Sequence, residues 1–196
     1  MRALVVFAHP CPESFNAALR DQVVASLKGR GAEVRLLDLY ADGFNPVMSA
    51  QERRDYHTPG VNEQPVRDHL DGLKWCDTLV FVYPTWWFAP PAMLKGWIER
   101  VFVPYVTFTI PNEKVAMGRA NLHHITRLAV VTTCGATWWV SKLVGEPGRR
   151  IIMRGLRVLC APTCRTLYLA HYQMDSSTPA TRTRYLKSVA TALRRF

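Results

Sequence analysis

The sequence predicts a single α/β domain built on a doubly wound parallel sheet with helices on both faces. Short, almost wholly apolar runs alternate along the chain with longer segments in which apolar residues recur at helical spacing. The 196 residues are 48% hydrophobic and 20% charged, a composition that supports a sizeable core and excludes a disordered chain. No internal repeat or linker interrupts the alternation, so we expect one domain over residues 1–196.

Five segments are predicted to form the strands of this sheet. A continuous apolar run is typical of a parallel strand that is covered by helices on both faces. The run that begins at Ala3 has this character, and the segment that begins at Thr78 repeats it. The predicted strands cover residues 3–8, 34–40, 78–83, 128–133 and 165–170.

The segments between these strands show the spacing of amphipathic helices. Leu19, Val23 and Leu27 recur at intervals of four residues. Ser14 is available as the N-cap of this helix, and Gly29 stops it. Further helices are predicted at about 91–102, 141–154 and 179–195.

Two stretches interrupt the regular alternation. Residues 42–65 are rich in glycine, proline and asparagine, and residues 104–121 separate a predicted helix from the fourth strand. Both are longer than ordinary connections, so we expect functional lids or interface segments there.

The chain is strongly basic. Its 25 lysines and arginines exceed its 15 aspartates and glutamates, which gives a net charge of +10 and a pI near 9.7. This charge is compatible with nucleic acid, an anionic membrane surface or a phosphorylated small molecule as partner. No basic run is interleaved with aromatic residues and no nucleic-acid-binding motif is present, so no nucleic-acid partner is expected.

The cysteines and the apolar segments predict a cytoplasmic protein. Five cysteines at irregular spacing favour free thiols over a disulfide framework or a metal site. The first apolar run is too short for a signal peptide. Residues 78–94 carry no charge, but Pro84, Pro90 and Pro91 would break a membrane-spanning helix there.

Ligands of open α/β sheets bind at the carboxyl ends of the strands, where the strand order reverses. After the first strand, the segment from His9 to Asn16 leads directly into a helix. Polar side chains and free N–H groups at a helix N-terminus favour a bound phosphate. The segment lacks the glycines of a dinucleotide fingerprint or a Walker loop. N-capping by Ser14 alone explains it equally well.

Three consecutive aromatic residues follow the third strand, in the segment Pro84, Thr85, Trp86, Trp87 and Phe88. A rigid aromatic wall suits a flat ring system, because it offers stacking area with little loss of entropy. A hydrophobic plug or a subunit contact is the alternative interpretation.

Hydroxyl and backbone donors gather after the fourth strand, at Thr132, Thr133, Cys134 and Gly135. Gly135 permits a tight turn that exposes backbone N–H groups, which suit the polar edge of a heterocycle. Turns of this kind also end many strands that bind no ligand. Together, a phosphate loop, an aromatic wall and a donor-rich turn on one rim of the sheet are the arrangement that a flavin needs.

These segments resemble those of the flavodoxin-like NAD(P)H:quinone oxidoreductases (DT-diaphorase type), a family that includes the ancillary oxidoreductases of bacterial potassium efflux. The resemblance extends over residues 2–196. Three motifs carry it: AHPCPESFN at 8–16, FNP at 44–46 and YPTWWFAPPAMLKGWIERVF at 83–102. It implies a flavodoxin-like three-layer sandwich whose five-stranded parallel sheet has the order 2-1-3-4-5.

The resemblance also implies a homodimeric flavoenzyme. Such an enzyme passes a hydride from NAD(P)H through a flavin, with FAD slightly favoured over FMN, to a quinone or similar small acceptor. The helix at 91–102 matches one near the dimer contact, where the partner subunit completes the active site. The matched flavin contacts are His9, Ser14, Phe15 and Asn16 at the phosphate; Pro84, Thr85, Trp86, Trp87 and Phe88 at the ring; and Thr132, Thr133, Cys134 and Gly135 at its pyrimidine end. No catalytic residue is assigned.

The sequence departs from the family's pattern at the last turn. The family's T-T-G-G is T-T-C-G here. Trp138 and Trp139 lie near the position of the family's tyrosine, where we expect them to narrow the pocket over the ring. The family's histidine has no counterpart, because His123 and His124 both precede the fourth strand.

Two functions from different classes are compatible with these features. The first is a ping-pong enzyme, in which NAD(P)H reduces the flavin and leaves before the acceptor enters. Backbone N–H groups near Gly135 would stabilise negative charge on the reduced ring. The second is a flavin-binding regulatory partner of a membrane potassium-efflux transporter. The basic helix at 179–195 would suit an anionic surface, although a solvated helix face explains the same charges.

Overall fold

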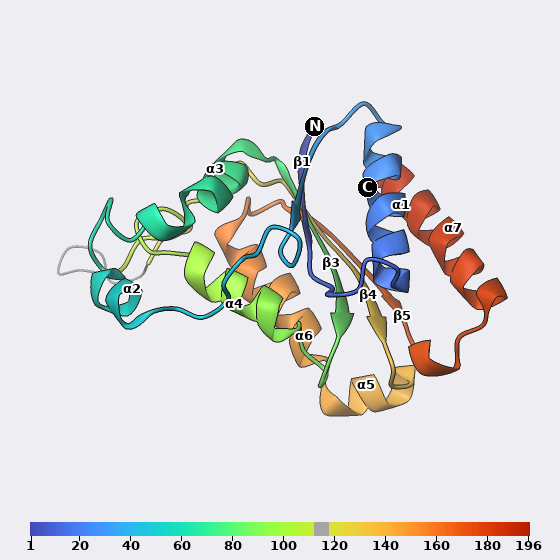
Figure 1. The fold of residues 1–196 in the computed structure, drawn as a ribbon. Helices are drawn as coiled ribbons and strands as arrows, with labels where there is room; N and C mark the ends of the chain where they lie inside the picture. The colour runs from blue at the N-terminus through green and yellow to red at the C-terminus, as the bar shows by residue number, and fades with distance from the viewer. Residues whose placement is uncertain (112–117) are drawn as a thin grey trace.

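The computed structural model describes residues 1–111 and 118–196 and confirms the predicted doubly wound architecture (Figure 1). Five parallel strands form one sheet in the order β2-β1-β3-β4-β5. The five predicted strands are all present, with ends that differ by at most two residues from those expected. They are β1 (Arg2–Phe7), β2 (Glu33–Asp38), β3 (Thr78–Thr85), β4 (Arg127–Cys134) and β5 (Arg165–His171).

Helices cover both faces of the sheet, so the fold has three layers (Figure 1). On one face lie α1 (Phe15–Lys28) and α7 (Pro179–Arg195), which pack against each other. On the other face lie α3 (Arg67–Trp75) and α4 (Ala92–Val101). Successive residues of a strand point to opposite faces. Leu4 of β1 therefore packs under α3, while Val5 faces α1 and α7.

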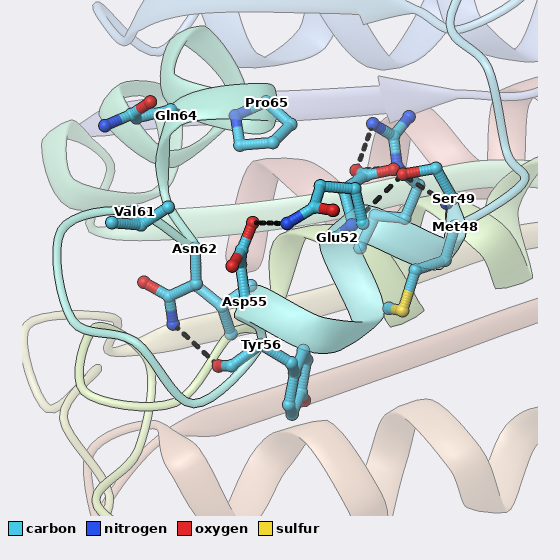
Figure 2. Close-up of a pocket in the computed structure, with 12 residues that line it drawn as sticks. Met48, Ser49, Glu52, Asp55, Tyr56, Val61, Asn62, Gln64 and Pro65 are labelled. Atoms are coloured by element: carbon cyan, nitrogen blue, oxygen red, sulfur yellow. Dashed lines mark hydrogen bonds and ion pairs between the residues drawn. The ribbon is translucent and has the colours of Figure 1, made fainter.

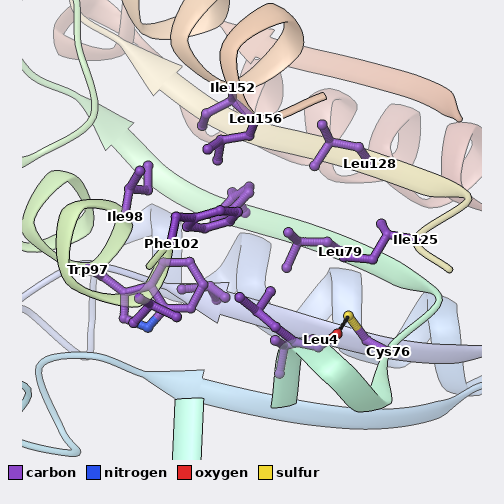
Figure 3. Packing of buried hydrophobic residues seen from close by; sticks show 14 of the residues in the cluster. Leu4, Cys76, Leu79, Trp97, Ile98, Phe102, Ile125, Leu128, Ile152 and Leu156 are labelled. Carbon is purple, nitrogen blue, oxygen red and sulfur yellow. Dashed lines mark hydrogen bonds between the residues drawn. The ribbon is translucent and has the colours of Figure 1, made fainter. Parts of the chain in front are cut away.

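The core under α3 and α4 is built around the Trp97 side chain, which is fully buried (Figure 3). Its ring lies edge-on to Phe81 of β3, with 5.9 Å between ring centroids, and to Phe102, at 5.8 Å. The indole N–H donates a hydrogen bond to His69 Nδ1 at 3.2 Å. This hydrogen bond compensates for burial of the indole nitrogen. The buried Trp97 also fixes the motif at 83–102, and with it the loop after β3, to the sheet.

The helix predicted at 141–154 is divided into shorter pieces, which corrects the sequence interpretation. They are α5 (Trp138–Val144), α6 (Pro147–Arg150), the π-helical η2 (Ile151–Leu156) and the 3₁₀-helical η3 (Arg157–Leu159). The break lies at Gly145 and Glu146, whose φ angles are 88° and 49°. Left-handed backbone cannot continue a right-handed helix, and Pro147 then begins the next one.

The stretch at 42–65 contains a helix that the sequence analysis did not predict. Helix α2 (Ala50–Asp55) is closed by a capping box, in which the Ser49 side chain and the Glu52 backbone N–H pair and Glu52 reaches back to Ser49 N. A 3₁₀ turn, η1 (Gln64–Val66), leads from this stretch into α3. In the second stretch, at 104–121, residues 112–117 lie outside the described residues.

The thiols give a direct test of the packing. Cys11 is exposed, whereas the remaining cysteines Cys76, Cys134, Cys160 and Cys164 are buried and free. Burial also raises the pKa of the Cys76 thiol to about 12, so the reactive thiolate is scarce there. We expect one thiol per chain to react rapidly with Ellman's reagent in the native protein and the other four to react after unfolding. Rapid reaction of several thiols without denaturant would contradict this packing.

Within residues 1–111 and 118–196, every helix is too short or too polar to cross a membrane.

Candidate functional site

A cavity of about 440 Å³ lies at the carboxyl ends of β3 and β4, where the sheet rule places a ligand. We call it the carboxyl-edge cavity. Eight of the residues that the sequence predicts as flavin contacts line it, and Ala136, Met174 and Asp175 complete the lining. The eight are Pro84, Thr85, Trp86, Trp87, Phe88, Thr133, Cys134 and Gly135.

Asn16 joins the loop after β1 to the end of β4. Its side chain is buried, and Nδ2 donates to Thr133 Oγ1 at 2.9 Å. Its Oδ1 is buried without a hydrogen-bond partner. A buried carbonyl oxygen without a donor is costly, so this atom is suited to accept a hydrogen bond from a ligand. At the preceding residue of β4, Thr132 Oγ1 lies 2.9 Å from Thr85 Oγ1 of β3, and the two hydroxyls pair with each other.

The aromatic residues after β3 form a tight turn, which we call the aromatic turn (residues 86–89). The backbone N–H groups of Trp86 and Ala89 each donate to the other's carbonyl, at 3.1 and 3.0 Å. The two central residues, Trp87 and Phe88, have φ angles of 48° and 61°. This is the geometry of a type I′ turn, which normally takes Asn or Gly because bulky residues there cost about 1–3 kcal/mol each. The Trp87 side chain is 94% exposed.

The turn after β4 approaches a carboxylate. A Cβ atom at position 135 would lie 2.5 Å from Asp175 Oδ2, so the turn and this exposed carboxylate approach each other closely. Cys134 is buried, and its Sγ lies 3.6 Å from Ser141 Oγ of α5. The polar rim of the cavity therefore carries an acidic acceptor as well as the backbone donors that the sequence predicts.

The residues at the start of α1 lie beside the cavity rather than in its lining. Ser14 caps α1, with its Oγ accepting from Ala17 N at 3.2 Å. His9 Nδ1 accepts from Cys11 N at 3.0 Å, and burial lowers the pKa of this imidazole. The His9 ring lies 6.0 Å from that of Trp86, which places the loop next to the aromatic turn. Phe15 instead packs edge-on against His171 at 5.7 Å.

A family model described as flavodoxin-like fold matches residues 1–153. The chain belongs to this flavodoxin-like family. The match ends before β5, whereas the resemblance predicted from the sequence continued to residue 196. The strand order is that of flavodoxin, in which the cofactor binds where the order reverses between the first and third strands. The cavity lies one strand further along, at the ends of β3 and β4, and the loop after β1 lies beside it.

Individual relatives and a solved structure extend this flavodoxin-like assignment. NAD(P)H dehydrogenase (quinone) 1 of Rattus norvegicus is 38% identical over 124 residues, which are 55% of this chain and 45% of the relative. The uncharacterized NAD(P)H oxidoreductase YcaK of Escherichia coli K12 is 39% identical over 102 residues, 52% of each chain. The chain therefore spans about half the length of the curated relatives it matches. The crystal structure of Smu.1420 from Streptococcus mutans UA159 superimposes with a TM-score of 0.85 at 29% identity and covers 100% of both chains.

Three residues at or after the end of β5 lie at this edge of the sheet but were missed by the sequence analysis. Met174 and Asp175 line the cavity, and both lie in the 3₁₀ turn η4 (Met174–Ser176). His171 ends β5 opposite Thr133, and its ring stacks on Tyr185 at 5.0 Å. Its Nε2 is buried without a partner, and burial together with the Arg182 charge lowers the pKa of this imidazole. For His171 the signal was available, because β5 ends at the same sheet edge as β3 and β4.

A second cavity of about 310 Å³ lies between α2 and the start of η1 (Figure 2). None of the predicted flavin contacts lines it. Several of its polar side chains pair with one another: Arg100 Nε donates to Glu52 Oε1 at 2.8 Å, and Gln51 Nε2 donates to Asp55 Oδ2 at 2.8 Å. Asn62 Oδ1 is buried without a hydrogen-bond partner. The carboxyl-edge cavity is the better candidate, because it lies at the carboxyl ends of the strands and is lined by the aromatic turn.

Proposed function

We propose that the chain is a flavin-dependent NAD(P)H oxidoreductase that passes two electrons from NAD(P)H through a bound flavin to a quinone or similar small acceptor. The observation that carries the proposal is the carboxyl-edge cavity, with an aromatic turn on one side and a Thr-Thr-Cys-Gly turn on the other. The names of the relatives at 38% and 39% identity, both NAD(P)H oxidoreductases, support the same reaction class.

The residues present fit a flavin. The cavity volume of about 440 Å³ lies in the range of small-molecule sites. Asn16 Oδ1 is a buried acceptor in need of a donor, and the first N–H groups of α1 have no partner inside the helix. The phosphate would lie against Ser14 and the first N–H groups of α1, and the ring against Trp86 and Phe88. Asn16 Oδ1 would accept a hydrogen bond from a hydroxyl group of the flavin beside the phosphate.

A bound flavin supplies the chemistry of accepting and releasing a hydride. The chain's own residues orient the ring and control the access of water. The aromatic turn presents a flat apolar wall, and the backbone at Gly135 presents polar groups at the opposite rim. Asp175 adds an acceptor there, which suits a ring N–H group. We assign no side chain to proton transfer.

The finer assignments follow the family resemblance. FAD is favoured over FMN, and a second copy of the chain is the proposed partner. Exposed apolar side chains next to the cavity support self-association: Trp87 is 94% exposed, Trp139 75% and Leu143 88%. The basic side chains of α7 are explained by a solvated helix face with cations near its C-terminus, so a membrane transporter is not proposed as partner.

An anaerobic two-step mixing experiment tests this function. NAD(P)H added to the flavin-loaded protein is expected to bleach the absorbance of the bound flavin near 450 nm. Subsequent addition of a quinone is expected to restore the absorbance without further NAD(P)H. A flavin that stays oxidised with both NADH and NADPH would overturn the proposal.

A further inference from the structure

The aromatic turn is supported from outside by the corner between α5 and α6. Both central residues of the turn have left-handed backbone, so neighbouring structure must hold them in place. Gly148 N donates to Phe88 O at 2.9 Å. A Cβ atom at position 148 would lie 3.0 Å from both Phe88 O and Ala89 Cα, so the two segments are in close contact.

Glu146 fixes this corner with a single carboxylate. Its side chain is 10% exposed, and Oε2 accepts from Lys142 Nζ at 2.6 Å and from Arg149 Nη1 at 2.9 Å. Its Oε1 accepts from the Tyr172 hydroxyl at 2.9 Å. The donors come from α5, from α6 and from the segment after β5. The carboxylate therefore joins three elements that surround the cavity.

Glu146 has a strained backbone conformation, which its side-chain contacts compensate. Its φ of 49° and ψ of 56° lie in the left-handed region, which non-glycine residues rarely adopt without compensation. Burial alone raises the pKa of the Glu146 carboxyl. Hydrogen bonds from Lys142, Arg149 and Tyr172 outweigh burial and lower that pKa below its usual value, so the group is charged at neutral pH.

We propose that Glu146 is a positioning residue of the flavin site, which holds the aromatic turn in its strained, ring-binding conformation through the contact of Gly148 with Phe88. The inference rests on the proposed function, because it assigns the turn to the flavin ring. It predicts that loss of the Glu146 charge loosens the corner first, then the turn, while the sheet keeps its packing.

The variant Glu146→Gln tests this role, with Glu99→Gln as the matched control. Glu99 pairs with Lys95 four residues earlier on the exposed side of α4, so the control removes an ion pair without touching the corner. In Glu146→Gln we expect flavin to bind at least tenfold more weakly. In the flavin-free protein we expect at least tenfold faster hydrogen exchange at the amides of Trp86, Ala89 and Gly148, with the β1 amides unchanged. The control is expected to match the wild type in both measurements.

A second variant changes the contact between Gly148 and Phe88 directly, without altering Glu146. Gly148→Ala places a methyl group against Phe88 O and Ala89 Cα, so it should displace the turn while leaving the Glu146 ion pairs in place. We expect the same pair of effects, weaker flavin binding and faster exchange confined to the turn. If both variants weaken flavin binding and speed exchange in the turn, then the position of the turn affects flavin binding even where the charge of Glu146 is kept.

Flavin binding and hydrogen exchange together distinguish failure of the proposed function from failure of the positioning role. A wild-type protein that binds no flavin would refute the proposed function, and the exchange rates in the flavin-free protein would still decide whether Glu146 holds the turn. Wild-type exchange at the three amides in Glu146→Gln would overturn the positioning role. Exchange that rises evenly across the whole sheet would also overturn it, because it would mean a general loss of stability.

Discussion

The substitution Gly96→Ala is expected to destabilise the fold by about 3 kcal/mol. Gly96 lies on α4 where the helix meets the FNP motif. A Cβ atom at position 96 would lie 2.2 Å from Pro46 O and 2.8 Å from Pro46 C. Both are backbone atoms, so neither can turn aside as a flexible side chain would. The better helix propensity of alanine, about 1 kcal/mol, offsets only part of this overlap. Urea unfolding followed by far-UV circular dichroism measures the loss.

Gly155→Ala is the matched control for this substitution. Gly155 lies in the helical segment η2, and a Cβ atom there would meet no heavy atom within 4 Å. The same chemical change should therefore leave the free energy of unfolding unchanged or raise it by up to about 1 kcal/mol. Equal stability of the two variants would contradict the close packing of α4 on Pro46.

The substitution Asn16→Asp is expected to weaken flavin binding about 100-fold, or about 2.7 kcal/mol. It keeps the size of the side chain but removes the Nδ2 group that donates to Thr133 Oγ1. It also adds a negative charge where the phosphate is proposed to bind, in a buried position with little screening. Quenching of flavin fluorescence on titration of the variant measures the dissociation constant.

Asn121→Asp makes the same chemical change at an exposed position and serves as its control. Flavin affinity within twofold of the wild type is expected for it. If Asn16→Asp also kept wild-type affinity, the phosphate would have to bind away from α1. Thermal unfolding of both variants without flavin shows whether the buried charge affects the fold as well as the site.

Most strands of the fold could be predicted from the sequence, because a parallel strand that is covered by helices on both faces is a continuous apolar run. Phe7 of β1 and Val82 of β3 belong to such apolar runs, and both are buried where the two strands pair. Helix α3 left a weaker signal, since it has no side-chain cap and buries only Leu70, Gly72 and Leu73. The break in the helix after β4 has a sequence signal that the sequence analysis overlooked, because Gly145 ends one helix and Pro147 begins the next. The left-handed backbone of Glu146 has no such signal, since it depends on partners distant in sequence such as Tyr172.

The residues of the candidate site also include some that the sequence predicts and some that it does not. The residues after β1, β3 and β4 could be predicted, because the carboxyl ends of parallel strands meet at one edge of the sheet. Asp175 could not, since it reaches Gly135 only through a turn that is fixed by the hydrogen bond from Gln173 N to Ala136 O at 3.1 Å. The strain in the aromatic turn is likewise invisible in the sequence, because Trp87 and Phe88 have no local preference for positive φ.

Direct titration of the flavin-free chain with FAD and with FMN tests the central claim, that the carboxyl-edge cavity binds a flavin. Saturation at one flavin per chain is predicted, with quenching of the flavin fluorescence and of tryptophan fluorescence from Trp86 and Trp87. Heat release and chromatography of the bound cofactor then identify the flavin, with FAD expected. A protein that takes up neither flavin would contradict the account.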